Sequence, residues 1–252
     1  MNYPFFYGFF YNVTGRKYCI FIHSYLNMKT IITCFFVVFF GAISFGQKDL
    51  LQLGDRYADD QIYASVSYAQ FYNQPSQISK SNFSYSLSAG FIKDVLLNQQ
   101  GSVSVAAGIG YGFDFFNHKL KVEEFNNTTL FGSDNAISSN LFKSHHLEFP
   151  LEFRWRTSTA IKYNFWRVYT GVKFLYNISN KFQFNEASDT TFMYSNISNY
   201  NKLQYGLTLS AGYDEFNIHI FYGLTPVFKD SNLNGEEINT KILKFGLIFY
   251  FL

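Results

Sequence analysis

The sequence is poor in charge, in cysteine and in long apolar segments. Charged residues make up 15% of the 252 residues and the formal net charge is +2, so the chain lacks the basic field that nucleic-acid binding requires. No Pro/Gly-rich linker divides it into domains. Beyond its N-terminal region, no segment is long and apolar enough for a transmembrane helix, so any crossing of a membrane requires strands.

Aromatic residues are abundant instead. They make up 21% of the chain, with 32 Phe and 20 Tyr. Soluble domains do not display so many rings, whereas a membrane β-barrel uses them in two girdles at the membrane–water interfaces. The composition therefore favours a protein that crosses a membrane with strands.

Residues 28–46 are predicted to be a secretory signal peptide. Lys29 gives a positive start, an apolar run follows from Ile31 to Phe45, and the small residues Ser44 and Gly46 stand at the −3 and −1 positions of the cleavage site. The apolar run is too short for a comfortable membrane span. We therefore expect cleavage after Gly46.

This signal peptide sets the other boundaries of the chain. Residues 1–27 are interpreted either as a misassigned start or as an extended n-region of the signal, and residues 47–60 as a periplasmic lead-in. Both cysteines, Cys19 and Cys34, lie before the cleavage site. The mature chain is then expected to have no disulfide, no thiol catalysis and no cysteine metal site.

The segment from His146 to Arg156 alternates with the period of a strand. Because successive side chains of a strand point to opposite faces, one face is wholly apolar and the other strongly polar. A soluble sandwich would bury the apolar face, whereas a membrane barrel turns it towards lipid and turns the polar face towards the lumen. Pro150 lacks a ladder donor, so a β-bulge is predicted there. The apolar face holds Leu147, Phe149, Leu151, Phe153 and Trp155; the polar face holds His146, Glu148, Pro150, Glu152, Arg154 and Arg156.

Seven further segments alternate in the same way, and the connections between the eight are alternately long and short. Bacterial outer-membrane barrels have such short periplasmic turns and long outer loops. About eight strands close into a cylinder filled by its own side chains. Residues 61–252 are therefore predicted to form an all-β, about eight-stranded antiparallel transmembrane β-barrel. The predicted strands are 61–71, 83–91, 102–115, 146–156, 165–177, 202–213, 216–224 and about 243–251, and the long loops are 72–82, 117–140, 178–201 and 225–239.

Charged residues that face the lumen form the candidate functional site. Buried charges must be paired, and opposite charges across strands stabilise a sheet. In one register Arg154 faces Arg167 and Glu148 faces Lys173; a shift of two residues places Glu152 opposite Arg167 instead. The network is interpreted either as a structural plug or as a path for a solute or proton. Its residues are His146, Glu148, Glu152, Arg154, Arg156, Arg167 and Lys173.

No motif indicates a cofactor or a metal. The G-x-G pattern in Gly108–Gly112 lies inside a strand alternation rather than between a strand and a helix. His146 and Glu148 share a face, but no third ligand stands at the spacing of a metal site. The calcium-like loop that begins at Asp230 has Lys241 where glutamate is required, so its Asn-Gly pair predicts a turn instead.

No motif indicates catalysis either. An enzyme at the rim of a barrel needs a nucleophile or a water molecule that is activated by an oriented base. The pair Ser144-His145 is too generic to identify one. The chain is therefore predicted to be non-enzymatic.

Five stretches of the mature chain carry a resemblance to a known family. They are HLEFPLEFRWRTST (146–159), FWRVYTGVKF (165–174), YNKLQYGLTLSAGY (200–213), FKDSNLNGE (228–236) and KFGLIFYF (244–251). They resemble the PorT-type outer-membrane β-barrels of the Bacteroidetes, specifically a flavobacterial member of this porin family, and the LEFPL core is the most specific part. The last stretch is also similar to the C-terminal signal that the barrel-assembly machinery reads, except that Leu252 follows the terminal aromatic residue.

The resemblance implies a location in the outer membrane of a Gram-negative envelope. Because PorT itself belongs to the type IX route that exports proteins across this membrane, the resemblance also implies a role in secretion as an accessory component, but it carries over no catalytic residues. The expected partners are outer-membrane lipid, the barrel-assembly machinery during insertion and components of type IX secretion, with no nucleic acid, and a monomer is expected. Three functions stay open: an accessory barrel of secretion, a structural or interaction barrel, and a narrow solute channel.

Overall fold

The computed structural model describes residues 4–13, 16–25, 60–78, 83–126, 128–133, 137–157, 166–186, 190–213 and 216–251, in two units. The unit within residues 1–50 contains an antiparallel hairpin of β1 (Pro4–Val13) and β2 (Arg16–Tyr25). The predicted signal peptide and most of the predicted lead-in lie outside the described residues, so both stay predictions. No helix among the described residues is long and apolar enough to cross a membrane.

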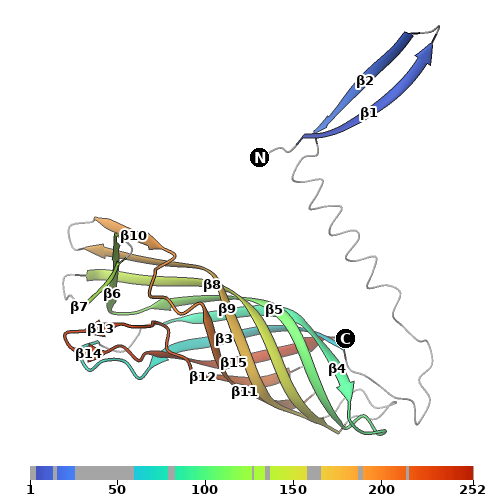
Figure 1. The fold of residues 1–252 in the computed structure, drawn as a ribbon. Coiled ribbons are helices and arrows are strands. Elements are labelled where there is room, and N and C mark those ends of the chain that lie inside the picture. Colours follow the sequence, from blue (N-terminus) through green and yellow to red (C-terminus); the bar gives the residue numbers. More distant parts are fainter. Residues whose placement is uncertain are drawn as a thin grey trace. The chain divides into compact units, whose positions relative to one another are not determined.

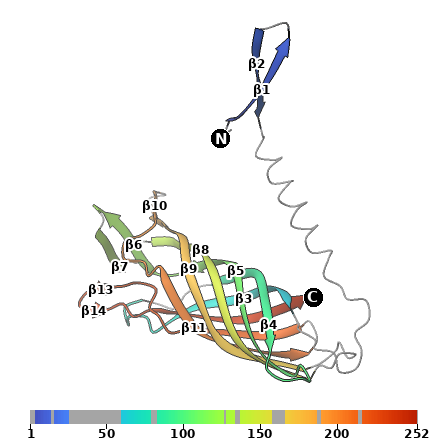
Figure 2. The same ribbon diagram turned by 45° about the vertical axis from the view of Figure 1, so that its right-hand side comes forward.

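In the unit within residues 51–252, eight antiparallel strands of the described chain close into a barrel (Figures 1 and 2). Each pairs with the next along the chain, and β15 pairs with β3 to complete the ring. The predicted fold class is thereby confirmed. The strands are β3 (Gln61–Tyr72), β4 (Tyr85–Leu96), β5 (Val103–Asn117), β8 (Ile137–Arg156), β9 (Trp166–Glu186), β11 (Leu203–Tyr213), β12 (Phe216–Gly223) and β15 (Lys241–Phe251).

The barrel is apolar outside and polar inside. On β8, Phe153 and Trp155 are 48% and 46% exposed, whereas Arg154 and Arg156 between and beside them are 0% and 1% exposed. A soluble sandwich would show the reverse. The exposure pattern therefore supports the membrane interpretation of the alternation, with the apolar face towards lipid.

Glycines make room for the large polar side chains of the interior. Gly110 and Gly112 face inward from β5, and a Cβ atom at these positions would overlap the Tyr63 hydroxyl group and the His146 ring. The small inward residues of β5 thus serve the packing of the lumen, as expected for a narrow barrel.

The predicted bulge at Pro150 is wrong. The register of β8 with β9 shifts between His145 and His146, where β9 has one extra residue, and not at the proline. On the other side, the ladder with β5 lapses opposite Phe149 and Pro150 and resumes in the same register. The missing donor of proline is therefore accommodated by a gap in hydrogen bonding rather than by an inserted residue.

The predicted long loops contain strands. β8 begins at Ile137 and β9 ends at Glu186, so both extend well beyond their predicted bounds. These extensions, together with β6 (Leu120–Phe125), β7 (Thr128–Ser133), β10 (Thr191–Ser195), β13 (Asn232–Leu233) and β14 (Glu236–Glu237), form what we call the outer cap. Figures 1 and 2 show these elements gathered at one end of the barrel.

The pairings in the outer cap are local. β6 pairs with β7, β10 pairs with the extension of β9, and β13 pairs with β14. The predicted Asn-Gly turn lies between β13 and β14, where Asn234 and Gly235 have φ angles of 51° and 88°. Two successive residues of positive φ are typical of the type I′ hairpin turn.

Candidate functional site in the barrel lumen

Near the end of the barrel with short turns, one carboxylate binds two arginines. The Asp94 carboxylate accepts from Arg154 Nη1 at 2.7 Å and from Arg156 Nη1 at 2.6 Å, and the three side chains are fully buried. Arg156 Nε also donates to the Gly101 carbonyl oxygen at 2.8 Å, and Arg154 Nε to Glu152 Oε2 at 2.9 Å. Such charge-assisted bonds fix the two guanidinium groups in one geometry.

Aromatic rings complete the surroundings of Arg154. Its guanidinium carbon lies 4.6 Å from the ring centroid of Tyr169 and 5.6 Å from that of Tyr250. Arg167 Cζ lies 5.9 Å from the Tyr250 centroid. Cations over ring faces are stabilised by the ring quadrupole, and more strongly when both are removed from water. This end of the lumen is therefore filled by a layer of charged groups and rings.

A second layer lies further along the lumen, around Glu148. Its carboxylate accepts from Tyr63 Oη at 2.9 Å and from Lys173 Nζ at 3.0 Å, and His146 Nε2 lies 3.3 Å from its Oε1. His146 Nδ1 lies 3.8 Å from Asp114 Oδ2, and the other oxygen of this carboxylate, Oδ1, accepts from Lys244 Nζ at 2.7 Å. His146 therefore connects two carboxylates that each hold a lysine.

All seven predicted site residues face the lumen and are buried, but neither considered register occurs. Arg156 lies opposite Arg167, Arg154 lies opposite Tyr169, and Glu148 lies opposite Leu175. Glu148 and Lys173 nevertheless form an ion pair, because Lys173 lies opposite Pro150 and reaches its diagonal neighbour. The buried residues are His146, Glu148, Glu152, Arg154, Arg156, Arg167 and Lys173.

Sequence reasoning missed several members of these layers. Asp94 lies in the short connection expected between the predicted strands 83–91 and 102–115, but β4 continues to Leu96 and its carboxylate points inward. Asp114 and Lys244 alternate with the outward-facing residues of their predicted strands, so the alternation alone could have identified them as lumen residues. Three tyrosines also occupy inward positions of the alternation: Tyr63, Tyr169 and Tyr250. Because many other tyrosines face lipid, the residue type alone does not identify these three as lumen residues.

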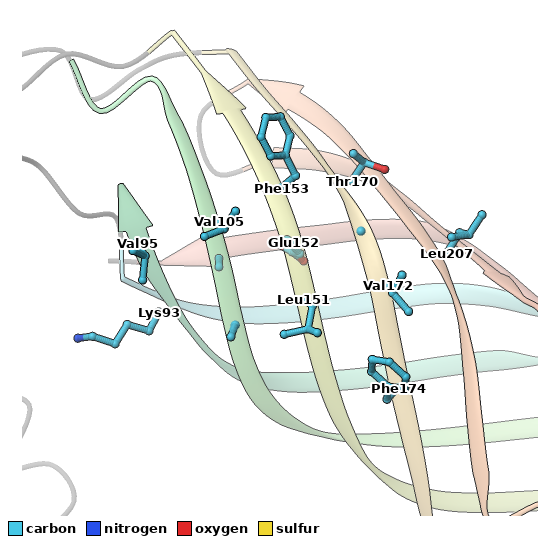
Figure 3. A pocket seen from close by; sticks show the side chains of 13 residues that line it. Lys93, Val95, Val105, Leu151, Glu152, Phe153, Thr170, Val172, Phe174 and Leu207 are labelled. Atoms are coloured by element: carbon cyan, nitrogen blue, oxygen red, sulfur yellow. The ribbon is translucent and has the colours of Figure 1, made fainter. Parts of the chain in front are cut away.

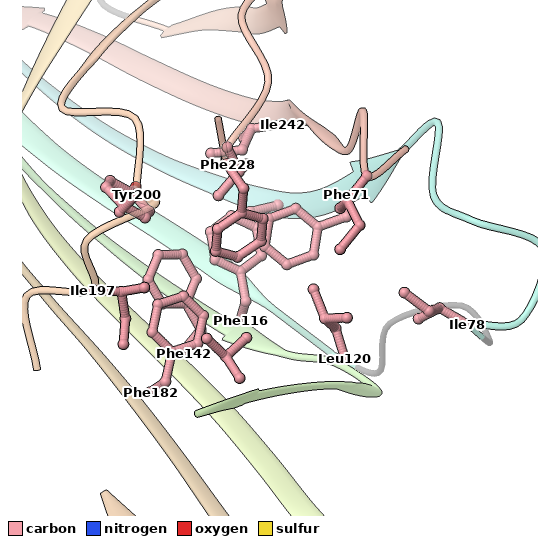
Figure 4. Close-up of a cluster of buried hydrophobic side chains, with 14 of the residues drawn as sticks. Phe71, Ile78, Phe116, Leu120, Phe142, Phe182, Ile197, Tyr200, Phe228 and Ile242 are labelled. Carbon is pink, nitrogen blue, oxygen red and sulfur yellow. The ribbon is translucent and has the colours of Figure 1, made fainter. Parts of the chain in front are cut away.

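The lumen on the side of the outer cap is closed by stacked aromatic rings that the sequence did not predict. Phe71 lies 4.1 Å from Phe116, Phe116 lies 5.6 Å from Phe142, and Phe142 lies 4.3 Å from Phe182, measured between ring centroids (Figure 4). We call these four residues the aromatic plug. They belong to a larger buried apolar cluster that also contains Leu120, Val122, Leu175, Ile197, Tyr200, Val227, Phe228, Leu233 and Ile242.

Two small cavities lie within the second charged layer. A cavity of about 10 Å³ lies among Glu148, Lys173 and Lys244, and another of about 10 Å³ lies beside Asp114 and His146. Each has room for about one water molecule. Among the described residues, no group of three His, Cys, Asp or Glu side chains is arranged to hold a metal ion.

A large pocket of the described residues lies outside the lumen. It has a volume of about 770 Å³ and is lined by outward-facing side chains, among them Val105, Leu151, Phe153 and Val172. Figure 3 shows these side chains on one face of β5, β8 and β9. Because the same face carries the exposed apolar residues of the barrel, this depression belongs to the lipid-facing surface.

A comparison with family models agrees with this architecture. A family model described as "Outer membrane protein beta-barrel domain" matches residues 45–229. No curated protein matches the chain. The crystal structure of Ail, the attachment invasion locus protein of Yersinia pestis, is similar over 76% of this chain and 96% of that chain, with 13% identity and a TM-score of 0.34. The family match covers most of the chain, which therefore belongs to the outer membrane protein beta-barrel domain family and lies in the outer membrane.

Proposed function

We propose that the protein is a non-enzymatic barrel that works through protein contacts of its outer cap, as an accessory component of type IX protein secretion. The observation that carries this proposal is the filled lumen. Two charged layers and the aromatic plug occupy the interior from one end to the other. A barrel with such an interior has its ends, rather than its lumen, available for function.

The outer cap has the order that a binding surface requires. Asn199 Nδ2 donates to the carbonyl oxygens of Lys229 and Asp230 at 3.0 and 3.1 Å, and Asn199 N donates to Thr129 Oγ1 at 3.3 Å. One asparagine thus connects three segments that are distant in sequence. Because little ordering entropy is lost when a preformed surface binds, such cross-linked loops favour tight contact with a partner.

The outer cap also presents apolar side chains that a soluble surface would avoid. Phe125 and Leu130 of the β6–β7 hairpin are 69% and 52% exposed, and Met193 of β10 is 51% exposed. All three lie on elements of the outer cap rather than on the lipid-facing strands. Exposed apolar residues on a rigid support are typical of a protein–protein contact.

The resemblance to PorT-type barrels supports secretion as the setting of these contacts. It includes HLEFPLEFRWR in β8 and FKDSNLNGE, which contains β13 and ends at the first residue of β14, so it covers both a lumen-forming strand and a part of the outer cap. A structural or interaction barrel without a role in export is the second candidate, and the filled lumen is compatible with it as well.

A secretion assay separates these two candidates. Deletion of residues 28–252 in the source bacterium is expected to leave type IX cargo in the periplasm, and the full chain is expected to restore export. A Phe125→Ser/Leu130→Ser variant that reaches the same level in the membrane is expected to restore export poorly. A Lys93→Gln variant, changed at the opposite end of the barrel, is the matched control and is expected to restore export fully. Normal export in the deletion strain would contradict a role in secretion.

A further inference from the structure

Two lysines face each other across β8 and β9 on the outside of the barrel. Lys143 and Lys181 are directly opposite in the register of the two strands. Their neighbours Phe142, Ser144 and Phe182 are buried in the interior, at 0%, 2% and 1% exposure. Since side chains alternate along a strand, both lysine side chains point outward. Directly opposite residues of an antiparallel pair have Cα atoms about 4.5–5.5 Å apart.

Nothing described around this lysine pair neutralises it. Like charges that are directly opposite destabilise a sheet. Lys143 Nζ lies 5.9 Å from the Phe115 ring centroid, and Lys181 is opposite Ser195 on its other side. None of the ion pairs among the described residues includes either lysine. The adjoining outward positions are polar or apolar but carry no carboxylate: Leu141, His145, Ser179, Gln183 and Ser195.

The lysine pair lies at the level of the lipid headgroups. Along β8, Lys143 is separated by about 12 residues from Trp155, an exposed aromatic residue near the short-turn end. At about 3.3 Å per residue and a strand tilt of about 40°, this separation corresponds to roughly 30 Å along the barrel axis. The apolar band of an outer-membrane barrel is about 25 Å tall. If Trp155 belongs to the girdle at one interface, the lysines stand just past the other.

We propose that Lys143 and Lys181 bind the phosphate-bearing headgroup of an anionic lipid in the outer leaflet. A phosphate group between the two ammonium groups would convert their repulsion into two charge-assisted hydrogen bonds. The hydroxyl groups of Ser179 and Ser195 stand on the same outward face and offer further donors. The phosphate comes from a membrane lipid because the apolar face of the same strands, at Leu147 and Phe149, lies directly below it.

The first test measures lipid retention. The full chain is reconstituted in phosphatidylcholine vesicles that contain about one tenth phosphatidylglycerol, and the lipids that stay bound are counted by native mass spectrometry. At about 1 kcal/mol for each lysine, a Lys143→Gln/Lys181→Gln variant is expected to lose about 30-fold of the preference for phosphatidylglycerol. A Lys202→Gln/Lys229→Gln variant removes the same charge from exposed positions elsewhere and is expected to keep the preference for phosphatidylglycerol. Equal retention by both variants would overturn the proposal.

The second test uses the sign of a stability change. In a neutral detergent, Lys143→Gln removes a repulsion and is expected to raise the urea midpoint of unfolding. In vesicles with phosphatidylglycerol the same substitution removes a ligand contact and is expected to lower it. A change of the same sign in both media would overturn the proposal. Inorganic phosphate in the neutral detergent is expected to leave the midpoint of the native chain unchanged; stabilisation equal to that by the lipid would show that a free ion, not a lipid, is the ligand.

Discussion

At the residue scale, single carboxylates of the lumen each contact more than one polar or charged side chain. Asp94 holds two arginines, Glu148 binds Lys173 and Tyr63, and Asp114 binds Lys244 beside His146. Removal of one partner from a buried ion pair leaves an uncompensated charge in a medium of low dielectric. These carboxylates should therefore be the most sensitive polar positions of the barrel.

Asp94→Asn is expected to destabilise the barrel by about 3–5 kcal/mol, since two buried guanidinium groups lose their counter-charge. Urea unfolding in lipid vesicles measures the change. Lys93→Gln is the control, because the pair of Lys93 with Asp60 is largely exposed, at 70% and 35% of the two side chains, and exposed pairs contribute about 0–1 kcal/mol. Similar small changes for both substitutions would contradict the account of the charged layer.

At the element scale, β8 and β9 each serve two environments. Between His146 and Arg156, β8 separates lipid from the charged layers, and between Ile137 and His145 it supports the aromatic plug and the outer cap. The change coincides with the register shift between His145 and His146. The extra residue on β9 reverses which positions of the alternation face inward. Beyond it, Asn180, Phe182 and Phe184 point inward.

The buried imidazole of His118, between β5 and β6, is expected to make the outer cap sensitive to pH. Burial lowers the pKa of His118 to about 3, and its Nδ1 accepts from Leu120 N at 3.2 Å, the position that a second proton would occupy. The ring is edge-on to Phe71, Phe142 and Phe182. When the cap opens, His118 regains its ordinary pKa of 6.5 and binds a proton below that pH, whereas the closed cap excludes this proton. The stability of the closed cap is therefore full above pH 6.5 and falls as the pH drops towards 3.

Acidification from pH 7.5 to 5 is expected to lower the free energy of cap opening by about 2 kcal/mol, at 1.36 kcal/mol for each pH unit below 6.5. Hydrogen exchange of the β6–β7 hairpin at the two pH values measures this opening. In a His118→Asn variant, which keeps an acceptor but does not titrate, the difference should disappear. An unchanged pH dependence in that variant would assign the effect to another group.

Alternation predicted the barrel strands and the inward position of all seven site residues, because lipid and lumen impose opposite polarity on neighbouring positions. It could not predict the register of β8 with β9, because a shift of two residues leaves every side chain on the same face. Nor could it predict the extra residue of β9 at Ile178, which shifts the pairing beyond His145. It also missed β6, β7 and β10. Their sequences lie in polar segments, and they are ordered by the apolar cluster beneath them rather than by their own pattern.

At the scale of the whole molecule, the central claim is that the lumen is a packed core rather than a passage. The charged layers begin at the end with short turns, the aromatic plug closes the side of the outer cap, and the two cavities at the second charged layer have room for about one water molecule each. Ions that cross a membrane need a continuous polar path. The stacked rings of Phe71, Phe116, Phe142 and Phe182 interrupt such a path.

The most direct measurement of this claim is the conductance of the purified full chain in a planar lipid bilayer. We expect a silent bilayer, with no steady current steps at any applied voltage that the membrane tolerates, while a water-filled porin inserted in the same bilayer conducts. A single steady and ion-selective conductance would contradict the claim and would make the lumen, rather than the outer cap, the functional part of the barrel.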